Sequence, residues 1–460
     1  MTVLQLALLL PNFLWAHPTM VEIVSAGILG IISGIAIGLL PGIGTATTLL
    51  LLYPVLSQFE LLQVFVFYLS LMSSTQYYGS VSAIVFGVAG EVTSLPAVKH
   101  GHKLFLQGQG AQALCYTSSG SFFAAMMSLV CFWLISVSLS DYFIFMLKGK
   151  VILTLLLIAL IVILLTSGKK IAAVCFAVLG AVAGQVGYDQ LHNVRFLTFG
   201  IPELEGGLSL FPIFCGLIII PVLWQQVSTN LVSKIPTVQQ VDFLHRLRLL
   251  IDFRHWTSVA RGGVIGFVVG LIPGCSYLIS SNIASSVEGK IVKDNQSIKQ
   301  LIAAESANNS GSISVLIPLL LLAIPIVFSE AVILGIAESK GFGYTTSLEL
   351  FDQNFSYIIA VLFVANLINW TLTGVFYNVI VSVYSYLSKY VYLAVAIICM
   401  GMLSWQGYQE YRFWFSIISF LIAVTIGLLT MRYNDEKFVF VYTYFVSTIM
   451  SDEIYRQFII

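Results

Sequence analysis

The residues best suited to bind a small ion or anion lie where an apolar helix is predicted to break. Glycines at every fourth position from Gly30 to Gly38 share one helix face, so another backbone can approach closely. Pro41 then ends or kinks this helix. The next helix would present unpaired N–H groups and hydroxyls within the membrane, which can form a site without a charged side chain. The predicted substrate-binding residues of this first break are Gly42, Gly44, Thr45 and Thr47.

Composition identifies the chain as an integral membrane protein. Hydrophobic residues make up 58% of the 460 residues, charged residues 9%, and the mean hydropathy is +0.95. Soluble domains contain only about 45–50% apolar residues. Lys+Arg and Asp+Glu both number 21, so net charge gives no reason to expect a nucleic-acid partner. The six cysteines are scattered without metal-binding spacing and are expected to be packed thiols.

The hydrophobic pattern predicts an all-α polytopic protein with about 10–12 transmembrane helices plus re-entrant or broken helices. A first transmembrane half, residues 1–225, would be joined by a polar, cytoplasmic linker, residues 226–261, to a second half, residues 262–460. Residues 44–56 are too short to span and are expected to form a half-helix. Expected spans lie at 21–40, 61–90, 111–138, 151–166, 171–187, 207–225, 328–341, 354–384, 388–404 and 411–431, with interfacial or polar loops at 90–103 and 288–300.

An internal duplication is predicted from a constant offset of 232 residues. At this offset Gly30, Gly34, Gly38 and Pro41-Gly42 align with Gly262, Gly266, Gly270 and Pro273-Gly274, and Gly79-Ser80 aligns with Gly311-Ser312. Two repeats with broken helices in corresponding positions, expected to be inverted, indicate a secondary transporter whose site lies between the repeats. The additional predicted substrate-binding residues are Tyr78, Gly79, Ser80, Gly274, Cys275 and Ser276.

A polar segment in the second half offers ligands for a cation. Paired asparagines at an expected helix break could offer carbonyl oxygens to a cation, or could instead cap the helix. Glu305 has three interpretations: an acid at the membrane interface, a partner of a basic loop residue, or an ion ligand. The predicted cation-binding residues are Glu305, Asn308, Asn309 and Ser310.

These motifs together resemble the large membrane subunit of the tripartite tricarboxylate transporter family, over approximately residues 20–430. The resemblance implies a permease of the bacterial inner membrane that carries an organic acid with a coupling cation, Na⁺ or H⁺, and needs no cofactor. It also implies a small membrane subunit and a periplasmic solute-binding protein as partners. The chain departs from the family pattern at Gly87–Gly90, His100–Lys103 and Ala323–Ile326. The motifs that carry the resemblance are Gly38–Gly44, Pro273-Gly274, Tyr77–Ser80, Gly184–Asp189 with Arg195–Gly200, and Glu305–Asn309.

The sequence therefore predicts a non-enzymatic permease for a di- or tricarboxylate that works by alternating access. Two alternatives stay open at this point. A membrane-embedded enzyme would need a cluster of catalytic or metal-binding side chains, whereas the close pair His100 and His102 lacks a third ligand. A transport-deficient family member acting as a receptor would keep the fold without coupled flux.

Overall fold

The computed structural model describes most of the chain. The described residues are 18–40, 44–87, 92–138, 149–189, 194–229, 242–272, 277–292, 297–343, 346–382, 390, 396–401, 403–404, 413–434 and 436–458.

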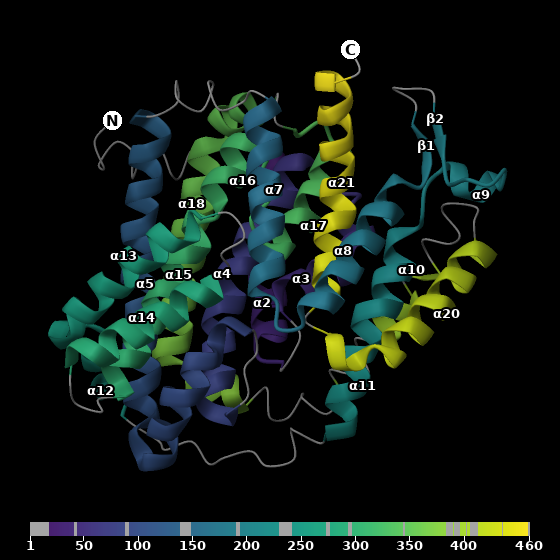
Figure 1. Cartoon of the computed structure of the whole chain (residues 1–460). Coiled ribbons are helices and arrows are strands. Elements are labelled where there is room, and N and C mark those ends of the chain that lie inside the picture. Colours follow the sequence, from purple (N-terminus) through teal and green to yellow (C-terminus); the bar gives the residue numbers. More distant parts are fainter. Residues whose placement is uncertain are drawn as a thin grey trace.

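Helices dominate the described part of the chain, as predicted from its composition (Figure 1). The first half contains α2 (Pro18–Gly38), α3 (Thr45–Leu56), α4 (Leu61–Phe86), η1 (Val92–Ser94), η2 (Ala97–His102), η3 (Phe105–Gln109), α5 (Gly110–Ser138), α7 (Gly149–Thr166), α8 (Lys170–Gln185), α9 (Pro202–Glu205), α10 (Leu210–Phe214), η4 (Cys215–Ile219) and α11 (Ile220–Thr229). The remainder contains α12 (Phe243–Leu250), η5 (Phe253–His255), α13 (Trp256–Gly270), α14 (Tyr277–Val292), α15 (Ser297–Ser314), α16 (Leu316–Leu322), α17 (Phe328–Glu338), α18 (Ser347–Val375), α20 (Phe413–Leu429), η6 (Met431–Tyr433) and α21 (Lys437–Phe458).

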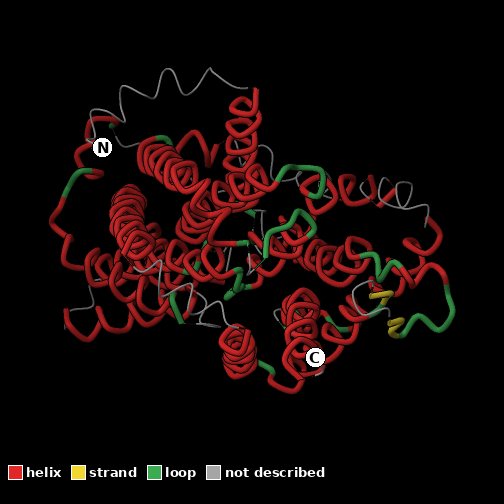
Figure 2. Tube along the Cα trace, turned by 90° about the horizontal axis from the view of Figure 1, so that it is seen from above, coloured by secondary structure: helices red, strands yellow, loops and turns green. Residues whose placement is uncertain are grey.

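One short antiparallel hairpin interrupts this helical pattern. Strand β1 (Gly187–Asp189) pairs with β2 (Val194–Phe196), and Tyr188 lies opposite Arg195. Seen from above, both strands lie at the periphery of the molecule (Figure 2). The hairpin therefore plays no part in the packed helical core.

The prediction of an all-α polytopic membrane protein is confirmed. Three helices in the described residues are long and apolar enough to cross a membrane: Met20–Gly38, Phe105–Ser136 and Phe351–Val375. Five shorter apolar helices accompany them: Thr45–Leu56, Leu153–Leu165, Lys170–Gln185, Phe211–Gln225 and Phe413–Leu429. The total of 10–12 spans stays a prediction.

Glycine faces hold two pairs of helices in close contact, as the spacing predicted. A Cβ atom added to Gly30 of α2 would lie 3.2 Å from Leu71 N of α4. A Cβ atom added to Gly262 of α13 would lie 2.9 Å from Ala303 Cα of α15. Leu71 and Ala303 are separated by the offset of 232 residues, but the duplication itself stays a prediction. The relative orientation of the two repeats stays a prediction.

The described parts of two expected loops are largely helical, which corrects the prediction for residues 92–103, 288–292 and 297–300. Helix α14 continues to Val292 because Glu288 is buried and paired: Arg261 Nη2 lies 2.7 Å from Glu288 Oε1, and Ser258 Oγ donates to the same oxygen at 2.6 Å. Within the expected interfacial loop at 90–103, η2 packs against α4 and α15, and His100 is buried. Charge alone did not indicate that these side chains could be enclosed between helices.

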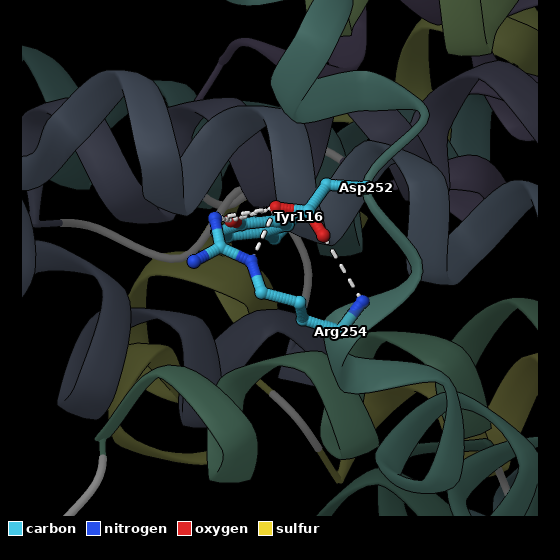
Figure 3. A network of polar contacts seen from close by, with 3 residues as sticks. All are labelled: Tyr116, Asp252 and Arg254. Carbon is cyan, nitrogen blue, oxygen red and sulfur yellow. Dashed lines mark hydrogen bonds and ion pairs between the residues drawn. The ribbon is translucent and has the colours of Figure 1, made fainter.

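The second part of the predicted linker docks on the helical bundle. Arg246 Nη1 of α12 donates to Val375 O of α18 at 2.8 Å. Asp252 accepts hydrogen bonds from the Tyr116 hydroxyl at 2.9 Å and from Arg254 Nε at 2.6 Å (Figure 3). The Arg254 guanidinium holds the pKa of the Asp252 carboxyl at about 2, below its ordinary value. This network attaches the linker to the start of α5; the domain boundaries themselves stay a prediction.

Candidate functional site

Helix α4 carries a buried polar belt, Ser70–Ser82, that several other helices contact. Thr75 Oγ1 lies 2.7 Å from Thr45 Oγ1 of α3. The Tyr77 hydroxyl donates to Asn366 Oδ1 of α18 at 3.2 Å, and Ser80 Oγ donates to Glu305 Oε2 of α15. Helix α4 is therefore the element around which the candidate site is arranged.

At the first predicted break, α2 ends at Gly38 and α3 begins at Thr45. Gly44 is the N-cap of α3 in an extended conformation and provides no side-chain cap. Thr45 and Thr47 are buried, but the Thr45 hydroxyl is bonded to Thr75, so the expectation of unpaired hydroxyls is wrong at this position. Backbone N–H groups of α3 remain the candidate anion donors. Gly42 lies outside the described residues.

At the second predicted break, α13 ends at Gly270 and α14 begins at Tyr277. Gly274, Cys275 and Ser276 lie outside the described residues. Helix α14 is nevertheless tied to α15, since Ser280 Oγ donates to Ala307 O at 3.3 Å. The start of α14 therefore lies beside the helix that carries the predicted cation ligands.

Glu305 is enclosed at the junction of α15 and α4. Its side chain is fully buried, Ser80 donates to Oε2, and Oε1 has no hydrogen-bond partner among the described residues. None of the ion pairs in the described part of the chain involves Glu305. Among the described residues Glu305 therefore has no basic partner, and its position relative to the membrane interface stays a prediction.

Asn308 lies one turn from Glu305 on the same helix and is also buried. Neither its Oδ1 nor its Nδ2 atom reaches full hydrogen-bond geometry with a described residue, but the amide lies close enough to the Glu305 carboxylate to interact with it. The predicted helix break at Asn308-Asn309 is wrong, because α15 continues to Ser314, and for the same reason these residues do not cap it. An uncompensated carboxylate oxygen and an unpaired amide carbonyl are groups that a cation would satisfy.

The other predicted cation ligands face elsewhere. Asn309 Nδ2 donates to Ser121 Oγ of α5 at 2.8 Å and to Glu305 O at 3.2 Å. Ser310 Oγ donates to Gly263 O of α13 at 2.6 Å and lies 2.5 Å from Ser128 Oγ of α5. Glu305 and Asn308 are thus brought together with Ser80, whereas Ser310 binds two neighbouring helices on another side of α15.

Tyr78, the aromatic residue of the predicted site, lies on α4 at its contact with α2. Tyr78 packs against Gly38 of α2, where an added Cβ would lie 2.9 Å from Tyr78 Cβ. Its hydroxyl is buried and has no partner among the described residues. Gly79 lies within α4 between Tyr78 and Ser80, so this motif presents one side chain toward α2 and one toward α15.

Two asparagines of α18 complete the belt and were missed in the sequence. Asn369 Nδ2 donates to Ser74 Oγ at 3.0 Å, and Asn366 accepts from Tyr77. Both are buried within a helix long enough to span the membrane. Polar residues within an apolar span are a recognised signal for a functional or packing role, so their position could have indicated them.

A second buried acid lies at a helix break that the sequence did predict. Backbone between α16 and α17 is non-helical around Pro325, and Ala323 has a positive φ of 52°. Glu330 Oε2 accepts from Ile326 N at 2.6 Å and from Val327 N at 3.2 Å. Glu330 therefore caps its own helix, unlike Glu305. The break expected at Pro318 falls at Val315, between α15 and α16, and Pro318 lies in the first turn of α16.

The described residues contain no group of three or more His, Cys, Asp or Glu side chains that could hold a metal ion.

The family described as tripartite tricarboxylate transporter TctA matches residues 24–442, nearly the whole chain. The chain belongs to the TctA family. The resemblance inferred from the sequence motifs is thereby confirmed.

Two relatives align with this TctA family member over most of their lengths. An uncharacterized 52.8 kDa protein in the TAR-I ttuC' 3' region of Agrobacterium vitis is 25% identical over 447 residues, which is 94% of this chain and 86% of the relative. An uncharacterized protein of Methanocaldococcus jannaschii is 24% identical over 417 residues, 89% of this chain and 94% of the relative. No solved structure gives a significant match.

Proposed function

We propose that this TctA family member is the permease for an organic acid such as a di- or tricarboxylate, coupled to Na⁺ or H⁺. Family membership makes it a membrane transporter component. The observation that carries the finer proposal is the buried, uncompensated carboxylate of Glu305 beside Ser80 and Asn308. Burying an unpaired charge costs on the order of several kcal/mol, which a bound cation would offset.

The proposed cation site lies between the two predicted repeats. Helix α4 belongs to the first and α15 to the second, and Gly79-Ser80 aligns with Gly311-Ser312 at the offset of 232. Rocking of one repeat against the other would separate Ser80 from Glu305 and change access to the ion. This arrangement supports alternating access.

The proposed anion site uses backbone donors near the same junction. The N-terminus of α3 carries no side-chain cap and adjoins α4 through the Thr45–Thr75 contact. Partial positive charge at such a helix end favours a carboxylate. Because Thr75 and Ser80 lie on the same helix, a carboxylate at α3 and a cation at Glu305 would be coupled through α4.

The remaining expectations from the family are also proposals for this chain. A small membrane subunit and a periplasmic solute-binding protein would be its partners, and the bacterial inner membrane its location. The alternative of a transport-deficient receptor predicts substrate binding without flux. This outcome is distinguished by the flux measurement described in the Discussion.

Binding is tested by the thermal stability of the purified protein. A di- or tricarboxylate that binds the folded state is expected to raise the unfolding temperature, with a gain of about 2.7 kcal/mol at about 100 times its Kd. The shift is expected to depend on Na⁺ concentration or on pH, whereas a neutral polyol of similar size is expected to give none. Identical unfolding temperatures across a carboxylate panel, with and without Na⁺, would contradict the proposal.

A further inference from the structure

Two turns bring exposed cationic side chains together at one end of the peripheral helices. Lys169 and Lys170 lie in the turn between α7 and α8, and Arg432 lies in η6 between α20 and α21. Lys169 Nζ donates to Arg432 O. The Tyr433 ring is approached by both cations, with its centroid 4.6 Å from Lys169 Nζ and 4.7 Å from Arg432 Cζ. This basic cluster is defined as Lys169, Lys170 and Arg432.

None of the ion pairs in the described part of the chain includes a residue of the basic cluster. Three other arginines are paired there: Arg195 with Glu205, Arg254 with Asp252, and Arg261 with Glu288. The neighbouring acid Glu436 is buried and accepts a hydrogen bond from the backbone Lys169 N at 2.8 Å. Asp435 lies outside the described residues. Like charges gathered on one surface repel each other, so an anion bound there would lower the free energy.

A buried lysine fixes the second turn so that Arg432 faces Lys169. Lys437 Nζ donates to Gly427 O, near the end of α20, and to Asn434 Oδ1, each at 2.8 Å. These bonds tie the end of α20 to the start of α21. The position of Arg432 in the basic cluster is therefore fixed by the packing of α20 against α21.

Exposed apolar side chains begin directly beside the basic cluster. Ile171 at the start of α8 is 84% exposed, and Leu429 at the end of α20 is 79% exposed. In a membrane protein such residues contact acyl chains, and adjoining Lys and Arg side chains lie at the level of the lipid headgroups. The combination of cations and apolar surface favours a ligand with a phosphate and acyl chains over a free phosphate ion.

We propose that the basic cluster binds the phosphate of an anionic phospholipid whose acyl chains lie along α8 and α20. The Arg432 guanidinium can donate two parallel hydrogen bonds to phosphate oxygens, and the two lysines add point charges.

The test measures lipid retention on the purified full-length protein by native mass spectrometry. Phosphatidylglycerol is expected to be retained in preference to phosphatidylcholine. In the triple variant K169Q/K170Q/R432Q, the ratio of retained phosphatidylglycerol to phosphatidylcholine is expected to fall at least about tenfold. A matched control, K103Q/R248Q/K290Q, changes the net charge equally at other exposed sites and is expected to behave as wild type. Glycerol phosphate at equal concentration is expected not to compete.

Three outcomes would overturn this proposal. They are retention unchanged in the triple variant, equal losses in the triple and control variants, and full competition by glycerol phosphate, which would indicate a site for a free phosphate. None of these results depends on transport, so they leave the proposed function untouched.

Discussion

Replacing Glu305 by Gln is expected to weaken strongly the dependence of substrate uptake on the coupling cation. The amide keeps the size of the side chain and can still accept from Ser80, but it removes the buried charge. Interactions with charged groups contribute about 1.5–3 kcal/mol each, so the apparent cation affinity is expected to fall about 10- to 100-fold. The measurement is uptake into proteoliposomes across a series of Na⁺ concentrations and pH values.

The matched control for this experiment is Glu330→Gln. Glu330 is also fully buried, but it caps the N-terminus of α17 through Ile326 N and Val327 N. Its variant is expected to lower stability and to leave the cation dependence unchanged. Asn308→Ala provides a second probe, because among the described residues the Asn308 side chain interacts with the Glu305 carboxylate and forms no other hydrogen bond. Cation dependence that survives in both E305Q and N308A would refute the proposed ion site.

Replacing Gly266 by Ala is expected to lower the stability of the folded protein strongly. A Cβ atom at this position would lie 2.7 Å from Ala307 Cα and would overlap the Ala307 carbonyl oxygen, and neither backbone atom can rotate away. Separating α13 from α15 would also disturb the turn of α15 that carries Glu305 and Asn308. Overpacking of this kind costs about 1–3 kcal/mol or more. The unfolding temperature of the purified variant measures the effect.

Gly401→Ala is the matched control, because it introduces the same methyl group into another helical glycine. Residues 396–401 are helical, and no atom of a described residue lies within 4 Å of the position a Cβ would occupy at Gly401. Alanine is favoured over glycine in a helix by roughly 0.5–1 kcal/mol, so this variant is expected to be neutral or slightly stabilised. Equal unfolding temperatures for G266A and G401A would show that close packing between α13 and α15 does not hold the fold.

Local sequence patterns predicted most helix positions well. The expected span at 21–40 is α2, and the half-helix at 44–56 is α3, which begins and ends within one residue of the prediction. Hydrophobic length and the breaks at Pro and Gly are local signals, so they need no knowledge of the tertiary structure. The four-residue glycine spacing likewise predicted which faces of α2 and α13 would pack closely.

Side-chain partners could not be predicted, because they depend on contacts between distant segments. Glu305 is 225 residues from Ser80 in the chain, and the Asn369–Ser74 bond spans 295 residues. The sequence placed Asn308 at a helix break because prolines follow it. In the structure the interruption falls at Val315, and Pro318 lies in the first turn of α16, where its missing N–H removes no hydrogen bond.

We expect this protein to transport a carboxylate across the membrane as well as to bind one. The direct measurement is counterflow of a radiolabelled carboxylate, chosen as the one with the largest thermal shift, into proteoliposomes preloaded with the same unlabelled compound. Wild-type protein, reconstituted with the small membrane subunit proposed as its partner, is expected to accumulate label transiently above the level of protein-free liposomes, and more so with the coupling cation present. Binding in the thermal-shift assay with counterflow equal to that of empty liposomes would contradict the account and would identify a receptor instead.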